Sequence, residues 1–265
     1  VWQGLRAMTE YSTLTSARAS FGYYTRPSDS FGVSVSAGFN HNGGHFVNEF
    51  TGDMCDRGDS GSVRVRMLGH KGLWDFDNSL SVGYTNEGGY AYHHYLPKDN
   101  ITEAVNYNDT SGYERLTINE GFVARYHNDN ISISSITSYQ YLDDCMTLDQ
   151  DFSPKSMFTM QQMQSEHSLT EEIVIRNTNT NQQWQWLSGA FIFGKWLDMS
   201  SPVTFKKDGI EGLILNNINN GLHTVFPDNN MTFGTDSFVI ASNFRIPTIG
   251  AALYHQSDIR LGRWN

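Results

Sequence analysis

Four histidines could bind a metal ion or a metal chelate through their imidazole nitrogens. They fall in or near segments without strand patterning: His41, His45, His93 and His94. No helical spacing of four residues fixes these side chains relative to one another. The alternative is therefore that they are solvated loop residues.

Aspartates gather in one later segment and could hold a hard cation through their carboxylate oxygens. They are Asp143, Asp144, Asp149 and Asp151. The segment lacks the glycine-centred spacing of a calcium loop, so solvated loop charge is the alternative. We name Asp149 and Asp151, with the four histidines, as ligand candidates without assigning them a metal.

No constellation typical of an enzyme is present. The sequence lacks a Gly-x-Ser-x-Gly elbow, a Walker phosphate loop and a His-Glu-x-x-His motif. Glu171 and Glu172 are neighbours in a strand pattern, so they point to opposite faces. We expect no catalytic activity and no cofactor.

Composition excludes one class of partner and favours one class of fold. The chain has 265 residues, with 18 basic and 28 acidic side chains and a net charge of −10. Nucleic-acid binding needs a basic stripe, and the basic residues here are scattered. Few runs could form a long amphipathic helix, and aromatic residues make up 13% of the chain. These features favour an all-β protein.

Alternating apolar and polar residues predict two-faced strands. The pattern is clearest at Phe31–Phe39, where Val33 and Val35 alternate with Ser34 and Ser36. Ten segments carry it: Leu5–Tyr11, Leu14–Tyr24, Phe31–Phe39, Val63–Met67, Trp74–Tyr84, Glu120–Asn128, Ile131–Leu142, Ser168–Asn177, Trp184–Trp196 and Ile249–Leu261.

Strand length and loop length favour a membrane barrel. Many of these segments exceed the usual five or six residues of strands in soluble proteins. No apolar stretch approaches the roughly 20 residues of a membrane-spanning helix. Short connections alternate with long, polar ones, near residues 42–60, 88–119, 143–167 and 197–248. Short turns at one end and long loops at the other are typical of outer-membrane barrels.

The positions of the arginines within the strands test which side of each strand is polar. Five arginines fall on the positions opposite each strand's apolar set: Arg18, Arg64, Arg66, Arg125 and Arg176. An arginine facing lipid at mid-membrane costs about 2 to 4 kcal/mol. In a barrel these side chains would therefore face the lumen, whereas in a sandwich they would face water.

Several stretches resemble the barrel of TonB-dependent outer-membrane receptors. The segment 38–48, with Gly52, Asp56-Arg57 and 62–65, is similar to the family's third strand, first large loop and fourth strand. The stretches 135–139 and 149–152 follow, and then 169–175 and 184–193, similar to the eighth and ninth strands. The likeness covers most of the chain in family order.

The resemblance implies an all-β antiparallel transmembrane β-barrel, here an incomplete curved sheet of about ten strands. The chain opens on Val1 without a targeting segment, and we interpret residues 1–265 as part of the barrel, without the plug. It implies import of a scarce nutrient such as a metal chelate, a location in the outer membrane of a Gram-negative bacterium, and coupling to the TonB complex through the missing plug.

Two alternatives stay open on the sequence alone. A passive outer-membrane porin uses the same strand pattern and has no plug. A secreted β-sandwich that binds glycans or acts as an adhesin would also contain two-faced strands. Location of the protein in the outer membrane separates the sandwich from both barrels.

Overall fold

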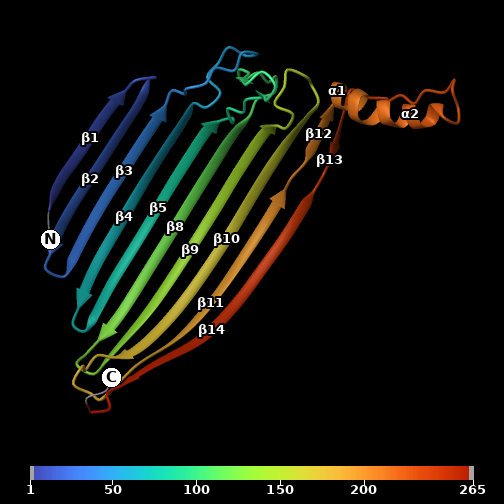
Figure 1. The fold of residues 1–265 in the computed structure, drawn as a ribbon. Coiled ribbons are helices and arrows are strands. Elements are labelled where there is room, and N and C mark those ends of the chain that lie inside the picture. The colour runs from blue at the N-terminus through green and yellow to red at the C-terminus, as the bar shows by residue number, and fades with distance from the viewer. Residues whose placement is uncertain (1–2, 263–265) are drawn as a thin grey trace.

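The chain folds into one curved layer of antiparallel strands in the computed structural model, which describes residues 3–262. Ten long strands lie side by side in chain order (Figure 1). They are β1 Gly4–Ser12, β2 Ser16–Ser28, β3 Phe31–Asn42, β4 Gly58–Lys71, β5 Trp74–Gly88, β8 Gly112–His127, β9 Ile131–Asp149, β10 Phe158–Asn177, β11 Trp184–Ser200 and β14 Asn243–Ile259.

The sheet does not close on itself. Within the described residues, β1 pairs with β2 and β14 pairs with β11, and the two outer strands do not pair with each other. This confirms the predicted all-β class and the incomplete curved sheet of ten long strands. Among residues 3–262, no helix combines the length and the apolar character needed to cross a bilayer.

The connections alternate between the two ends of the sheet (Figure 1). Those after β2, β4, β8 and β10 are short and share one end, while those after β3, β5, β9 and β11 share the other. Gly72, with φ of +62°, allows the tight turn between β4 and β5. The alternation follows from antiparallel pairing of strands that are neighbours in the chain.

The long connections are shorter than the sequence suggested, because the strands continue past their apolar stretches. The predicted loop 143–167 consists mainly of strand: β9 runs to Asp149 and β10 begins at Phe158. Backbone pairing needs no apolar face, so polar residues such as Asp143 pair as well as apolar ones. The remaining connections are 43–57, 89–111, 150–157 and 201–242.

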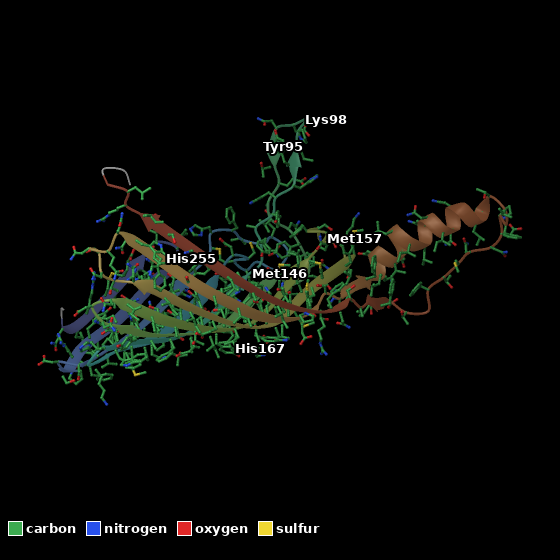
Figure 2. The ribbon with its side chains drawn as sticks, turned by 90° about the horizontal axis from the view of Figure 1, so that it is seen from below. Tyr95, Lys98, Met146, Met157, His167 and His255 are labelled. Atoms are coloured by element: carbon green, nitrogen blue, oxygen red, sulfur yellow. The ribbon has the colours of Figure 1, made fainter. Side chains whose placement is uncertain are left out.

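The last connection contains elements that alternation did not predict. β12 Val203–Lys206 pairs with β13 Ser237–Ile240, and between them the chain forms α1 Lys207–Gly209, the π-helical turn η1 Ile210–Leu215 and α2 Asn216–His223. Apolar residues every three or four positions explain the helix: Ile210, Ile214, Ile218 and Leu222. The helix extends sideways from the sheet, and the β6 Tyr95–Leu96 and β7 Ile101–Thr102 hairpin, with Tyr95 and Lys98, projects from the same end (Figure 2).

A small apolar core joins two of the long connections. Cys55 in connection 43–57 is buried with Val105 and Tyr107 of connection 89–111, and Ala91 packs against them. The side chain of Asn48 is also buried and donates to the backbone of Tyr107. The two connections therefore form one packed unit at that end of the sheet.

Candidate functional site

The strand register places all five predicted arginines on one face of the sheet. Residues directly opposed in a pair project to the same side. Arg64 opposes Ser36 on β3, and Arg66 opposes Ser34. These two serines point to the same side of β3 as Asn40, which opposes Arg18 on β2. We call this side the polar face.

The same side continues across the later strands. Arg66 opposes Ser79 on β5. Ser79 points to the same side of β5 as Asp75, which opposes Arg125 on β8. Arg125 opposes Ser134 on β9, and Arg176 on β10 opposes Ser132. The polar face therefore runs from β2 to β10, and all five arginines project from it.

The opposite side, the apolar face, carries the aliphatic residues. Val35 opposes Val65 and Val65 opposes Leu80, while Val63 opposes Val82. These residues have little to contact within the layer, and Leu80 and Val63 are 41% and 49% exposed. A wide exposed apolar surface marks a site of contact with lipid, a ligand or another protein.

A row of one lysine and two aromatic residues bounds the apolar face at one end, and a polar row bounds it at the other. At the end with short turns, Lys71 opposes Trp74, and Trp74 opposes Tyr126. At the other end, Asp59 opposes both His41 and Asn86. From Lys71 to Asp59 the strand is roughly 40 Å long at about 3.3 Å per residue, which at a tilt of about 40° spans roughly 30 Å. That height matches the hydrocarbon core of a bilayer.

Two carboxylates interrupt the apolar face near the middle of the strands. Glu171 on β10 accepts hydrogen bonds from Ser135 Oγ at 2.7 Å and Thr137 Oγ1 at 2.5 Å. Glu120 on β8 accepts one from the amide of Asn78. Each carboxylate therefore has its own neutral donors on the adjoining strand, as a buried polar group requires.

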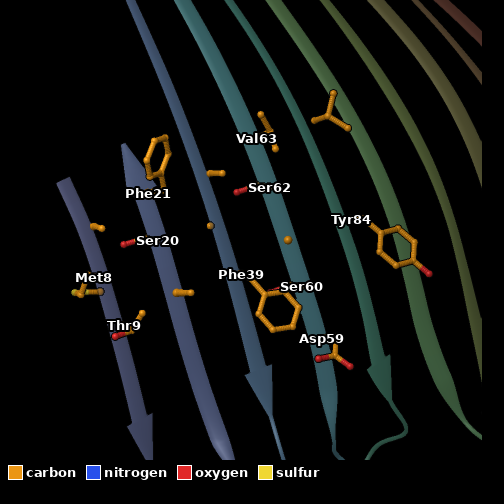
Figure 3. A pocket seen from close by; sticks show the side chains of 16 residues that line it. Met8, Thr9, Ser20, Phe21, Phe39, Asp59, Ser60, Ser62, Val63 and Tyr84 are labelled. Carbon is orange, nitrogen blue, oxygen red and sulfur yellow. The ribbon is translucent and has the colours of Figure 1, made fainter. Parts of the chain in front are cut away.

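An apolar groove of about 600 Å³ lies on the apolar face over β1 to β5 (Figure 3). The small residues Ala19, Ala37 and Gly61 leave space between the rings of Phe21 and Phe39. The groove arises because bulky and small residues alternate diagonally across neighbouring strands. Nothing charged lines it except Asp59 at its outer end.

Charged side chains on the polar face are largely held by neighbours. Arg66 Nε lies 2.8 Å from Asp77 Oδ1, and a second guanidinium nitrogen reaches Asp77 Oδ2 at 2.5 Å. Arg64 Nε donates to Ser79 at 2.9 Å, and Arg125 Nε to Ser134 at 3.3 Å. Charge and hydrogen-bond pairs of this kind suit a surface that faces water or another polar surface.

A second cluster of polar side chains lies beside Arg66 and Arg125, near the short turns. The carboxylate of Asp75 sits between two imidazoles, 2.7 Å from His70 Nδ1 and 3.4 Å from His127 Nδ1. Asp75 and His70 line a hollow of about 600 Å³ with Arg66, Arg125 and the turn after β2. The sequence pattern indicated the strands but not this convergence, which depends on the register of β4, β5 and β8.

The predicted histidine ligands do not come together. His41 lies in β3, not in a loop, and its Nδ1 is 2.7 Å from Asp59 Oδ1 on the apolar face. His93 packs edge-on against Phe46 and bonds the carbonyl of Glu103, while His94 lies 3.1 Å from the Glu103 carboxylate. Within residues 3–262, no three histidine, cysteine, aspartate or glutamate side chains are arranged to hold a metal ion.

His45 belongs to a hydrogen-bonded turn in connection 43–57. Asp56 accepts the backbone N–H groups of His45 at 2.8 Å and Phe46 at 3.0 Å. Burial alone would raise the pKa of Asp56, but these two donors outweigh it and hold the pKa below its usual value. Gly44 makes the turn possible, with φ of +91° and space for no Cβ beside Met54.

The two predicted aspartate ligands stabilise the β9–β10 connection. Asp149 is fully buried and accepts the N–H groups of Asp109, Asp151 and Phe152. Asp151 accepts the N–H of Ser153 at 3.1 Å. Aspartates that bond the backbone a few residues ahead shape turns, so this geometry accounts for both residues without a metal.

Arg115 is a residue of the polar face that the sequence pattern missed, because it fell within the predicted loop 88–119. It lies in β8 and opposes Thr85. The alternation of Arg115 and Thr117 with Leu116 and Ile118 was the available signal. Its guanidinium bonds Asp144 at 3.1 Å and stacks over Tyr113 at 4.9 Å.

Comparison with known proteins supports the fold. No protein-family model matches the sequence, and no curated protein sequence matches it. The solved structure of the ferric yersiniabactin uptake receptor from Yersinia pestis superposes with a TM-score of 0.56 at 13% sequence identity. The match covers 96% of this chain and 44% of that receptor, so the chain spans less than half of its length. The chain is thus similar in fold to part of an uptake receptor.

Proposed function

We propose that this chain forms part of the β-barrel of a TonB-dependent outer-membrane receptor that binds a scarce nutrient, such as a metal chelate, and imports it. The apolar face would contact lipid, and the polar face, with Arg18, Arg64, Arg66, Arg125 and Arg176, would line the lumen. The TonB complex would act through a plug supplied outside this sequence.

The observation that carries the proposal is the separation of the two faces over ten long strands. The apolar face lies between the Lys71–Trp74–Tyr126 row and the His41–Asp59–Asn86 row, which are roughly 30 Å apart, the thickness of a bilayer core. The fold likeness to an uptake receptor supports the same assignment. A sandwich is disfavoured, because the long strands of the described chain form one layer with no second sheet packed on it.

A matched pair of substitutions on β4 tests which face meets lipid. Val63→Arg places a charge on the apolar face, and Ser62→Arg places it on the polar face one residue away. We expect Val63→Arg to lower the stability of the bilayer-inserted protein by about 2 to 4 kcal/mol, and Ser62→Arg to change it by less than about 1 kcal/mol. Urea unfolding from lipid vesicles, followed by tryptophan fluorescence, measures both.

Equal effects of the two substitutions would contradict the assignment of the faces. A chain that remains monomeric and cooperatively folded in buffer without detergent would contradict a membrane barrel altogether and favour the secreted sandwich. Uptake assays in cells that express the full reading frame, with and without TonB, separate the receptor from a passive porin, because only the receptor's uptake depends on TonB.

A further inference from the structure

A hollow of about 390 Å³ opens on the polar face of β2 to β8, toward the ends that carry the long connections. Its floor exists because Gly38 and Gly83 have no side chains. Both glycines oppose Ser62, which lies between them on β4. Two further hydroxyl residues, Ser20 and Thr117, line the same floor.

A row of five side chains forms the outer edge of this hollow. The register aligns them one per strand: Arg18, Asn40, Ser60, Thr85 and Arg115. All five line the hollow. Four strand spacings of about 4.8 Å separate the Cα atoms of the two arginines by roughly 19 Å. The guanidinium of Arg115 lies at Asp144 on β9, so it turns inward when it binds a ligand in the hollow.

The two arginines are placed to act as anion receptors. Arg115 is held by Asp144 and Tyr113, yet its side chain stays 45% exposed, so donors remain for a ligand. Arg18 Nε donates a long hydrogen bond, 3.5 Å, to Asn40 Oδ1, and its other guanidinium nitrogens make no hydrogen bond within the described residues. A guanidinium binds carboxylate and phosphate oxygens through paired N–H groups.

The residues between the arginines are neutral and rich in hydrogen-bonding groups. Asn40 offers an amide, and Ser60 and Thr85 offer hydroxyls that donate or accept. Such groups match hydroxyl or carbonyl oxygens on a ligand. Within the hollow the pattern is therefore cation, neutral polar centre, cation. The register also places a carboxylate on the outer side of each cation, since Glu10 opposes Arg18 and Asp144 opposes Arg115.

We propose that this hollow is a ligand site for a hydroxyl-rich organic acid with an anionic group at each end. The arginines bind the two anionic ends, and Asn40, Ser60 and Thr85 bind the oxygens between them. This proposal rests on the proposed function in one respect: the polar face must line the lumen, so that an imported ligand comes into contact with the hollow. If it does, the imported nutrient belongs to the class of ligands with exposed acidic groups.

D-glucarate is a suitable probe, because it carries two carboxylates joined by four hydroxyl-bearing carbons. Glucitol has the same hydroxyl chain without charge, and adipate has the two carboxylates without hydroxyls. Isothermal titration of the protein in lipid nanodiscs should show glucarate binding, weaker adipate binding and no glucitol binding. Equal affinity for glucitol, or no affinity for glucarate at millimolar concentration, would overturn the site.

Two substitutions and two controls locate the binding. We expect Arg18→Gln to weaken glucarate binding about tenfold to a hundredfold, because a charged donor is lost. Gly38→Val should abolish it by filling the floor, since a Cβ there meets only Ser62 Oγ at 3.8 Å. Arg176→Gln and Gly121→Val alter the same face elsewhere, and a Cβ at Gly121 meets nothing within 4 Å. Loss of binding in the controls as well would refute this location.

The failure of this proposal can be told apart from failure of the proposed function. The unfolding measurements on Val63→Arg and Ser62→Arg are made without ligand, so they report on which face meets lipid whether or not glucarate binds to the unsubstituted protein. Normal insertion without glucarate binding overturns the ligand site alone. Failed insertion with glucarate binding in detergent supports the site and overturns the membrane assignment.

Discussion

Asn48 holds Tyr107 from a neighbouring connection through two hydrogen bonds: its Nδ2 donates to the Tyr107 carbonyl at 2.8 Å, and its Oδ1 accepts the Tyr107 N–H at 3.1 Å. The Asn48 side chain thereby replaces a piece of β-ladder between connections 43–57 and 89–111. The residue is 3% exposed, so water cannot substitute for it.

Replacement of Asn48 by alanine should therefore loosen both connections together. We expect a loss of about 1 to 3 kcal/mol in the opening free energy of this unit, because buried backbone groups lose their partners. Hydrogen exchange of 43–57 and 89–111 measures it. Asn220→Ala, at an exposed position of α2, is the control, and loosening of connection 89–111 by that control would contradict the assignment.

The hydroxyls beside Glu171 should stabilise the folded protein only while the carboxylate is present. Loss of both donors in Ser135→Ala/Thr137→Val leaves a polar group unpaired on the apolar face, at a cost of about 1 to 3 kcal/mol for each donor. In a Glu171→Leu background the same double change should have little effect. Urea unfolding in vesicles measures the free energy of unfolding of the unsubstituted protein, the Ser135→Ala/Thr137→Val variant, the Glu171→Leu variant and the variant that combines them. Additive effects on this free energy would show that the contacts are not coupled.

Acid should open the turn around Asp56. Because the folded pKa of Asp56 lies below its usual value, its contribution to stability is complete above about pH 4 and is lost as pH falls through the folded pKa. Protection of the His45 and Phe46 amides, corrected for intrinsic exchange, should decrease below that pH. Asp56→Asn should flatten the dependence, and an unchanged profile in this variant would assign the acid response to another group.

The β1–β2 hairpin should become more stable with better turn residues. Leu14 and Thr15 have φ of 59° and 52°, a left-handed conformation that costs ordinary residues about 1 to 2 kcal/mol each. Leu14→Asn/Thr15→Gly, the preferred pair for such turns, should slow exchange in β1. Thr13→Gly lies outside the two strained positions and should not. Faster exchange in the double variant would show that the native side chains stabilise the turn.

The sequence alone determined the strands and their faces. Alternation at Val33, Ser34 and Val35 is a local property with a period of two, so it can be read without knowing which strand lies beside it. The same reasoning separated Arg64 and Arg66 from Val63 and Val65. The sequence also indicated at which connections the chain reverses, because turn residues interrupt the pattern.

Only the tertiary structure decided which residues meet across strands and within the connections. The row from Arg18 to Arg115 depends on the relative register of five strands, and no local pattern encodes that register. Asn48 meets Tyr107, and Asp149 turns inward to bond backbone groups, because side chains in irregular segments take their positions from packing and hydrogen bonding rather than from periodicity. The helical segment 207–223 was missed because its apolar residues repeat every four positions, a pattern that a search for strand alternation passes over. The extension of β9 to Asp149 was missed because the polar residues there do not alternate with apolar ones.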